Sequence, residues 1–209
     1  LDSNMLVDQT STVPDSLQEA HFTEWFVGTE AEPSWLERAL EARADVPLKM
    51  VAMHHPLATL SWHERDYHKS SYGPNLLDKR KQLLDVLLKH NVDVVLAGHE
   101  HLYERNHLTV CREGQQRTLH TVISSGGGAL VRDTATEEEL QTRIARYATQ
   151  GFDVHLDAQR SVYHFTDATL RDSTLSLTTH TVPVDRPRNG EVLDTLRVTG
   201  GGEGASCTP

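Results

Sequence analysis

Residues 94–101 limit the possible folds of this chain more than any other segment. They begin with Val94–Ala97, a short apolar run rich in β-branched residues, which predicts a strand buried on both faces, as in parallel sheets. Gly98 ends the run and should permit a sharp turn of the backbone. His99 and His101 follow, and in an extended backbone residues two apart project to the same side. We therefore expect both imidazoles in one space at the carboxyl end of a strand, where open α/β sheets place their chemistry.

A second histidine follows another short apolar run. Residues 50–53 read Met-Val-Ala-Met and lead directly into His54. Leucines then recur at helical spacing over residues 76–90, with Asn75 as the expected N-cap. Strand, helix and strand form a βαβ unit with parallel strands, because the crossover is almost always right-handed. His54 and His99 should therefore leave the same edge of the sheet.

The histidines at these two strand ends form a candidate metal site. His54, His99 and His101 offer three imidazoles, a ligand set that suits zinc, iron or manganese. The same set also fits a binding module that holds a single zinc ion. It fits a mononuclear zinc hydrolase as well, although the sequence identifies no general base for one. The residues alone leave these alternatives open.

The two histidine motifs resemble those of a known enzyme family. The Val-x-x-His motif ending at His54 and the Gly-His-x-His motif ending at His101 are similar to the last two signature motifs of calcineurin-like metallophosphoesterases. The Tyr-Glu-Arg run at residues 103–105 resembles the continuation found in the purple acid phosphatase branch. The resemblance implies an α/β fold, part of a four-layer α-β-β-α sandwich with a mixed sheet and C-terminal antiparallel strands.

The resemblance also implies metal-dependent hydrolysis of phosphate esters. In a two-metal site, ions about 3.5–4 Å apart clamp the attacking and leaving oxygens. By resemblance, His54 and His99 share one metal and His101 serves the other, the cofactors being two divalent or trivalent ions of iron, zinc or manganese. Such close cations need an anionic bridge, which in the family is an aspartate of earlier motifs. This sequence lacks those motifs.

A long polar loop covers residues 58–73, at the carboxyl end of the first strand, where loops of this length are usually functional. His63 follows His54 at nearly the spacing at which a histidine of purple acid phosphatases reaches over the metals to the phosphate. The resemblance implies that His63 is catalytic and binds the substrate. Glu64 stands where many plant-type relatives have a second histidine, so we do not expect an acid–base role shared by two adjacent histidines.

The missing motifs bear on domain organisation. We expect residues 1–199 to be the C-terminal part of one metallophosphoesterase domain, with the missing N-terminal half as a partner, and residues 200–209 to be a flexible glycine-rich tail. The isolated chain would then be inactive. The alternative is a catalytically silent fragment or binding module that holds at most one metal ion.

The net charge limits the kinds of partner that the chain can bind. The formal net charge of −10 argues against a general affinity for nucleic acid or anionic membranes, which leaves a phosphate ester as the expected partner. No apolar stretch approaches the length needed to span a bilayer. Cys111 and Cys207 could pair, but the sequence does not decide it. The resemblance favours an extracytoplasmic location.

The remaining elements are predicted from periodicity and turn residues. Residues 5–32 are polar and predict a loop with at most one helical turn. Glu104 and Arg105 predict a buried pair that braces the loop behind the ligands. Thr136 and Glu139 form a capping box that opens a helix. We further expect a helix over 33–44, a strand over 118–125 closed by glycines 126–128, a turn at 188–190, and strands over 152–156, 161–167, 174–181 and 191–198.

Overall fold

The computed structural model describes residues 1–3, 14–69, 75–112, 114–185, 190–200 and 205–207. The helical elements are α1 (Asp15–Phe22), the π-helix η2 (Thr23–Val27), α2 (Trp35–Glu41), the 3-10 helix η3 (Trp62–His68), α3 (Leu76–Lys89) and α4 (Glu137–Ala148). The strands are β1 (Met50–Ala52), β2 (Val94–Ala97), β3 (Tyr103–Arg112), β4 (Gln115–Ser124), β5 (Asp153–Arg160), β6 (His164–Arg171), β7 (Thr174–Thr181) and β8 (Val192–Thr199). No helix in the described ranges has the length and apolar character needed to cross a membrane.

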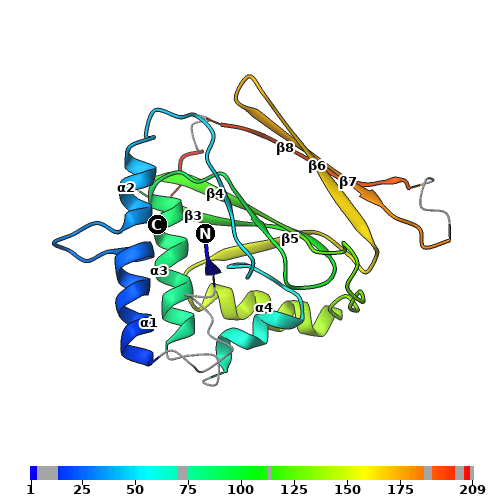
Figure 1. The fold of residues 1–209 in the computed structure, drawn as a ribbon, viewed down its shortest axis with the longest axis horizontal. Helices are drawn as coiled ribbons and strands as arrows, with labels where there is room; N and C mark the ends of the chain where they lie inside the picture. Colours follow the sequence, from blue (N-terminus) through cyan, green and yellow to red (C-terminus); the bar gives the residue numbers. More distant parts are fainter. Residues whose placement is uncertain (4–13, 70–74, 113, 186–189, 201–204, 208–209) are drawn as a thin grey trace.

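The strands form two sheets (Figure 1). The larger has five strands in the order β1-β2-β4-β3-β5, and the smaller has three in the order β6-β7-β8. β1, β2 and β4 run parallel, while β3 is antiparallel to both of its neighbours. The parallel pairing of β1 with β2, joined through α3, confirms the predicted βαβ unit.

Two apolar cores separate three layers. Leu83 and Leu87 of α3 pack with Val95 in the core between the helices and the larger sheet. Tyr103 and Leu177 belong to the second core, between the two sheets. Figure 1 shows the smaller sheet on the side away from α3. The predicted α/β class, with a mixed sheet and C-terminal antiparallel strands, is confirmed. The described residues build three of the four expected layers.

The start of the chain departs from the sequence prediction. Residues 15–27 are helical throughout rather than mostly loop, because Phe22 and Phe26 are buried and meet edge to face at 5.7 Å. The polar residues around them hide this short apolar stripe in the sequence. Residues 4–13 lie outside the described part of the chain. The Asn75 side chain makes no capping bond, since its backbone is left-handed with φ of 56°, so that expectation was wrong.

The segment after β8 is attached to the hairpin formed by β3 and β4. Cys111 and Cys207 form a disulfide, and the Cys207 N–H donates to the Gly114 carbonyl at 3.0 Å. The Gln116 N–H donates to the Ala205 carbonyl at 2.8 Å. Residues 201–204 and 208–209 of the expected tail, and most of the turn at 188–190, lie outside the described residues. The boundary at residue 199 and the flexibility of the tail stay predictions.

Candidate active site

His54 and His99 meet at the carboxyl ends of β1 and β2. The strand pairing continues past both strands, since the Met53 N–H donates to the Leu96 carbonyl and the Gly98 N–H donates to the His54 carbonyl, each at 3.0 Å. His54 Nε2 and His99 Nδ1 lie 3.2 Å apart. The structure therefore brings these two residues together at one edge of the sheet, as their position after parallel strands predicts.

His101 is placed differently from its sequence expectation. His99 and His101 have φ of 73° and 55°, so the backbone is left-handed at both and the rule for extended segments does not apply. Gly98 has no positive φ, and the sharp turn depends on the two histidines instead. Among the described side chains, the groups whose ligand atoms lie within 4.8 Å of one another contain His99 but not His101. Its role as a ligand stays a prediction.

The described part of the chain gathers two candidate metal groups, and both contain His99. One is His54, His55 and His99, and the other is His63, Asp66 and His99. His55 is buried, and its Nδ1 lies 2.9 Å from the Ser3 hydroxyl, so its Nε2 is the nitrogen left for a ligand role. Sequence reasoning missed His55 as a ligand, although its place directly after His54 was a signal.

Burial keeps the imidazoles of His99 and His55 neutral. It lowers the pKa of His99 to about 3, with further lowering by His63, His55 and His54. It lowers the pKa of His55 to about 4, again with a contribution from His54 and His63. Neutral imidazole is the protonation state that binds a metal. His99 and His55 can therefore bind a cation without first losing protons.

His63 extends from η3 toward His99, their ring centres lying 4.0 Å apart. Its Nδ1 bonds to Asp66, and its Nε2 is buried without a hydrogen-bond partner in the described part of the chain. Burial alone would raise the pKa of Asp66, but bonds from His63 and Lys69 lower it. Asp66 therefore stays ionised beside the histidines. Sequence reasoning missed Asp66, for which the spacing of three residues from His63 on one helical turn was the available signal.

Two buried glutamates hold the backbone that carries His63. Glu100 accepts bonds from the Thr59 hydroxyl at 2.7 Å and from the His63 N–H at 3.2 Å. Burial first, and then the charge of Glu104, raise the pKa of Glu100 to about 8. Glu104 accepts from the Leu60 N–H at 2.7 Å. The site histidines and their loop are thus linked through the buried carboxyl groups of Glu100 and Glu104, which reach no solvent.

The expected pair of Glu104 and Arg105 was wrong. Neighbouring residues of a strand point to opposite faces, so Glu104 faces the loop while Arg105 faces the smaller sheet. Arg105 Nε lies 2.7 Å from Asp194, and its Nη1 lies 3.0 Å from Asp157. Of the expected pair, only Glu104 contacts the loop, through the Leu60 N–H.

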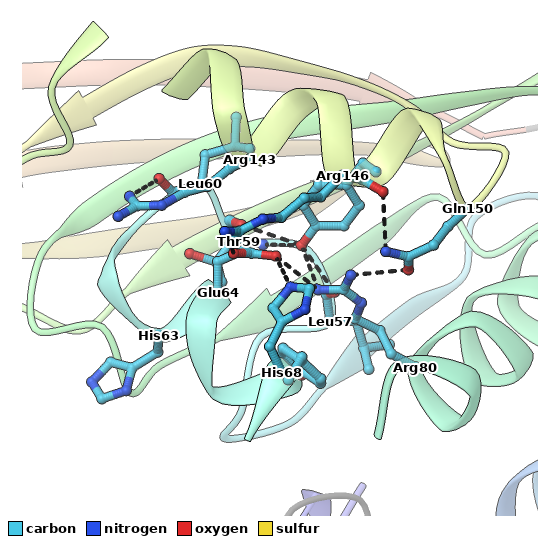
Figure 2. Close-up of polar contacts among 12 residues, drawn as sticks. Leu57, Thr59, Leu60, His63, Glu64, His68, Arg80, Arg143, Arg146 and Gln150 are labelled. Carbon is cyan, nitrogen blue, oxygen red and sulfur yellow. Dashed lines mark hydrogen bonds and ion pairs between the residues drawn. The ribbon is translucent and has the colours of Figure 1, made fainter. Parts of the chain in front are cut away.

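Glu64 points away from His63, into a buried polar network (Figure 2). Its Oε2 accepts from Arg146 of α4 at 2.7 Å, and its Oε1 lies 2.8 Å from His68 Nε2. Arg80 is also fully buried, with its Nη1 4.0 Å from Glu64. In Figure 2, His63 points away from this network on the other side of the same short helix. Glu64 therefore attaches η3 to α4, which explains why an acid stands directly after the candidate catalytic histidine.

Part of the chain matches a known protein family. A family model for calcineurin-like phosphoesterases matches residues 9–103. The expected likeness to this family is confirmed. The matched range contains His54, His63, His99 and His101. None of the curated proteins shows significant sequence similarity to the chain.

Solved structures with the same architecture agree with the phosphoesterase-like fold. GAP50, the anchor in the inner membrane complex of Plasmodium, has a TM-score of 0.57 and 13% identity, over 97% of this chain and 48% of that one. The purple acid phosphatase PPD1 from yellow lupin seeds has a TM-score of 0.53 and 21% identity, over 84% of this chain and 29% of that one. PhoD has a TM-score of 0.50 and 12% identity, over 85% of this chain and 36% of that one. The chain spans less than half the length of each.

Proposed function

We propose that this chain carries metal-ligating and phosphate-contacting side chains of a metal-dependent phosphoesterase. In this proposal His54 and His99 share one metal ion, His101 ligates a second, and His63 contacts the phosphate of the ester. The supporting observation is the distance of 3.2 Å between His54 Nε2 and His99 Nδ1, within a range that matches the phosphoesterase family. Two nitrogens on one tetrahedral ion, each about 2.0–2.1 Å from it, lie about 3.3 Å apart.

The donor set fits the metals that the family implies. Neutral imidazoles suit iron and zinc, and the ionised carboxylate of Asp66 lies in the same cluster. When bound, the ions supply Lewis-acid stabilisation of charge on the phosphoryl group. Asp66 holds the Nδ1 side of His63, which leaves Nε2 to donate to a phosphate oxygen. His63 would thus stabilise negative charge and orient the ester.

A second metal needs ligands beyond this cluster. Asp66 lies 2.6 Å from the Lys69 ammonium, so its charge is already partly compensated. We propose that residues 1–199 form the C-terminal part of one phosphoesterase domain and that an N-terminal half supplies the bridging carboxylate. The Cys111–Cys207 disulfide supports an oxidising, extracytoplasmic compartment.

The test separates metal binding from turnover. Titration of the chain with Zn²⁺, Mn²⁺ or Fe²⁺ should reveal a site that His99→Ala weakens, because His99 belongs to both candidate groups. Hydrolysis of p-nitrophenyl phosphate should require the N-terminal half together with this chain. Turnover by the joined halves that His99→Ala leaves unchanged would overturn the proposal.

One observation favours the alternative for the chain alone. Both candidate groups among the described residues share His99, so this cluster would hold one ion at a time. A silent binding module with one metal ion would show the same titration, but no turnover even after addition of the N-terminal half.

A further inference from the structure

A cavity of about 420 Å³ adjoins the candidate active site. It lies between η3, whose Trp62 forms one wall, and residues 131–136, which lie between β4 and α4 in the chain. Trp62 directly precedes His63, and the Arg132 N–H donates to the His101 carbonyl at 3.0 Å. Both walls are therefore attached to residues that the proposed function places at the phosphate and the metals. Pockets for small ligands typically have volumes of about 300–1,000 Å³, so the cavity is large enough for one.

Hydrogen bonds to neighbouring elements hold both walls in place. The Ala135 N–H donates to the Gln159 side chain of β5 at 2.8 Å, which fixes the segment ahead of α4. Arg143 Nη1 donates to the Leu60 carbonyl at 2.6 Å and so connects α4 to the segment that leads into η3. The cavity is thus a formed feature of the fold.

Arg132 brings a positive charge to the cavity that lacks a counter-ion. Its side chain lines the cavity, and its Nε is buried without a hydrogen-bond partner in the described part of the chain. None of the described carboxylates forms an ion pair with this guanidinium. A buried donor without an acceptor is costly, and an anionic oxygen of a ligand would satisfy it.

Two acids also line the cavity, but they leave the charge of Arg132 available. Glu139 Oε1 lies 3.3 Å from Arg143 Nη2, so a second arginine of the wall already matches its charge. Asp133 is exposed, and water screens its charge. Of these four charged side chains, Arg132 alone has a buried polar atom without a partner among the described residues.

Trp62 provides an apolar surface in the same cavity. The residue is 42% exposed, and the Arg65 guanidinium covers one face of the indole at 3.3 Å from the ring centre. The rest of the indole can contact an apolar part of a ligand. A cation without a counter-ion in a cavity with an aromatic wall suits a ligand that carries an anionic group on an apolar frame.

We propose that Arg132 determines the specificity of the phosphoesterase by binding a second anionic group on the alcohol portion of the ester. The substrate class is a phosphate ester whose alcohol carries a carboxylate or a further phosphate, with its apolar part against Trp62. His63 contacts the phosphate that is hydrolysed, and the rest of the substrate extends into the cavity. This inference rests on the proposed function, because it concerns the leaving group of the same reaction.

The test compares esters that differ by one charge. Phenyl phosphate is compared with meta- and para-carboxyphenyl phosphate in the protein with both halves of the domain and its metals. For at least one carboxylated ester, Arg132→Gln should lower kcat/KM about 10- to 100-fold more than it does for phenyl phosphate, as expected for loss of a hydrogen bond between charged groups. Arg132→Lys should keep part of the preference, because it keeps the charge.

Arg117→Gln is the matched control. Arg117 is also partly buried, but it lies near the start of β4, whereas Arg132 follows the end of that strand. Its replacement should leave the ratio of kcat/KM between the two kinds of ester unchanged. An equal loss for both kinds of ester in Arg132→Gln would overturn the inference, provided that circular dichroism shows the variant to be folded.

A second measurement needs no variant. Phenylphosphonate and its two carboxylated forms resist hydrolysis, because their phosphorus is bonded to carbon. In the wild type, a carboxylated form should inhibit turnover at a concentration about 10-fold or more below that of phenylphosphonate, and added salt should reduce this difference. Equal inhibition by all three would overturn the inference and leave the proposed function standing. Absence of hydrolysis of every ester would instead overturn both.

Discussion

Glu64 and Arg146 form an ion pair of 2.7 Å between positions 82 residues apart in the chain. Through this pair, η3 is attached to α4 on the side opposite His63 (Figure 2). The buried end of the pair is Glu64, which also faces His68 and Arg80. The position of the candidate catalytic histidine therefore depends on a carboxylate that never contacts the site.

Replacement of Glu64 by alanine should destabilise the fold strongly. It leaves the buried Arg80 guanidinium without its carboxylate, a change that costs about 3–5 kcal/mol of unfolding free energy. Arg146→Ala should cost less, because the Arg146 side chain is 43% exposed and Glu64 keeps His68 and Arg80. Urea denaturation of both variants measures the difference. Equal losses would show that Arg80 does not depend on Glu64.

Gly126 should not tolerate a side chain, in contrast to its neighbour Gly127. A Cβ at Gly126 would lie 2.7 Å from the Val162 carbonyl oxygen and would collide with the His164 ring, whereas nothing lies within 4 Å of one at Gly127. Gly126→Ala should lower the unfolding free energy by about 1–3 kcal/mol through overpacking. Gly127→Ala should stay within about 0.5 kcal/mol of the wild type. Thermal unfolding of the two variants checks this, and similar melting temperatures would contradict it.

Removal of His63 should separate turnover from metal content. In the protein with both halves of the domain, His63→Ala should lower kcat about 10²–10⁴-fold, the range for loss of a group that acts on the reacting centre. Bound metal, measured by atomic emission, should change little, because His54 and His99 remain. His180→Ala serves as the control, since His180 lies on β7 of the smaller sheet, and should leave both quantities unchanged. An unchanged rate in His63→Ala would show that His63 takes no part in turnover.

Acid should destabilise the metal-free chain from about pH 6.5 downward. Burial lowers the pKa of His164 and of His90 below the ordinary 6.5. Below that pH these two histidines bind protons in the unfolded chain but not yet in the folded chain. The stability present above about pH 6.5 is therefore lost as the pH falls. Urea midpoints measured at about pH 7.5 and about pH 5 give the change of the unfolding free energy with pH. His164→Gln should make this change smaller, and a flat profile in the wild type would contradict the prediction.

Sequence reasoning succeeded where the order of strand, helix and strand determines which residues meet in the fold. His54 and His99 follow two strands joined by one helix, and parallel pairing alone brings them to one edge. It was wrong for the pair of Glu104 and Arg105, since their true partners come from distant segments such as Leu60 and Asp194. The direction of His101 depends on a left-handed backbone at that residue. Residues other than glycine adopt this conformation uncommonly, and the spacing of histidines does not predict it.

The Cys111–Cys207 disulfide joins positions 96 residues apart and encloses β4, α4 and the whole smaller sheet. A single cut of the backbone anywhere between these cysteines therefore releases no piece until the disulfide is reduced. The same closure shields the enclosed residues from tension, because a force applied to residues 1 and 207 passes through the sulfur atoms. Only the segment before Cys111, which holds both histidine-bearing strand ends, would be extended by such a pull.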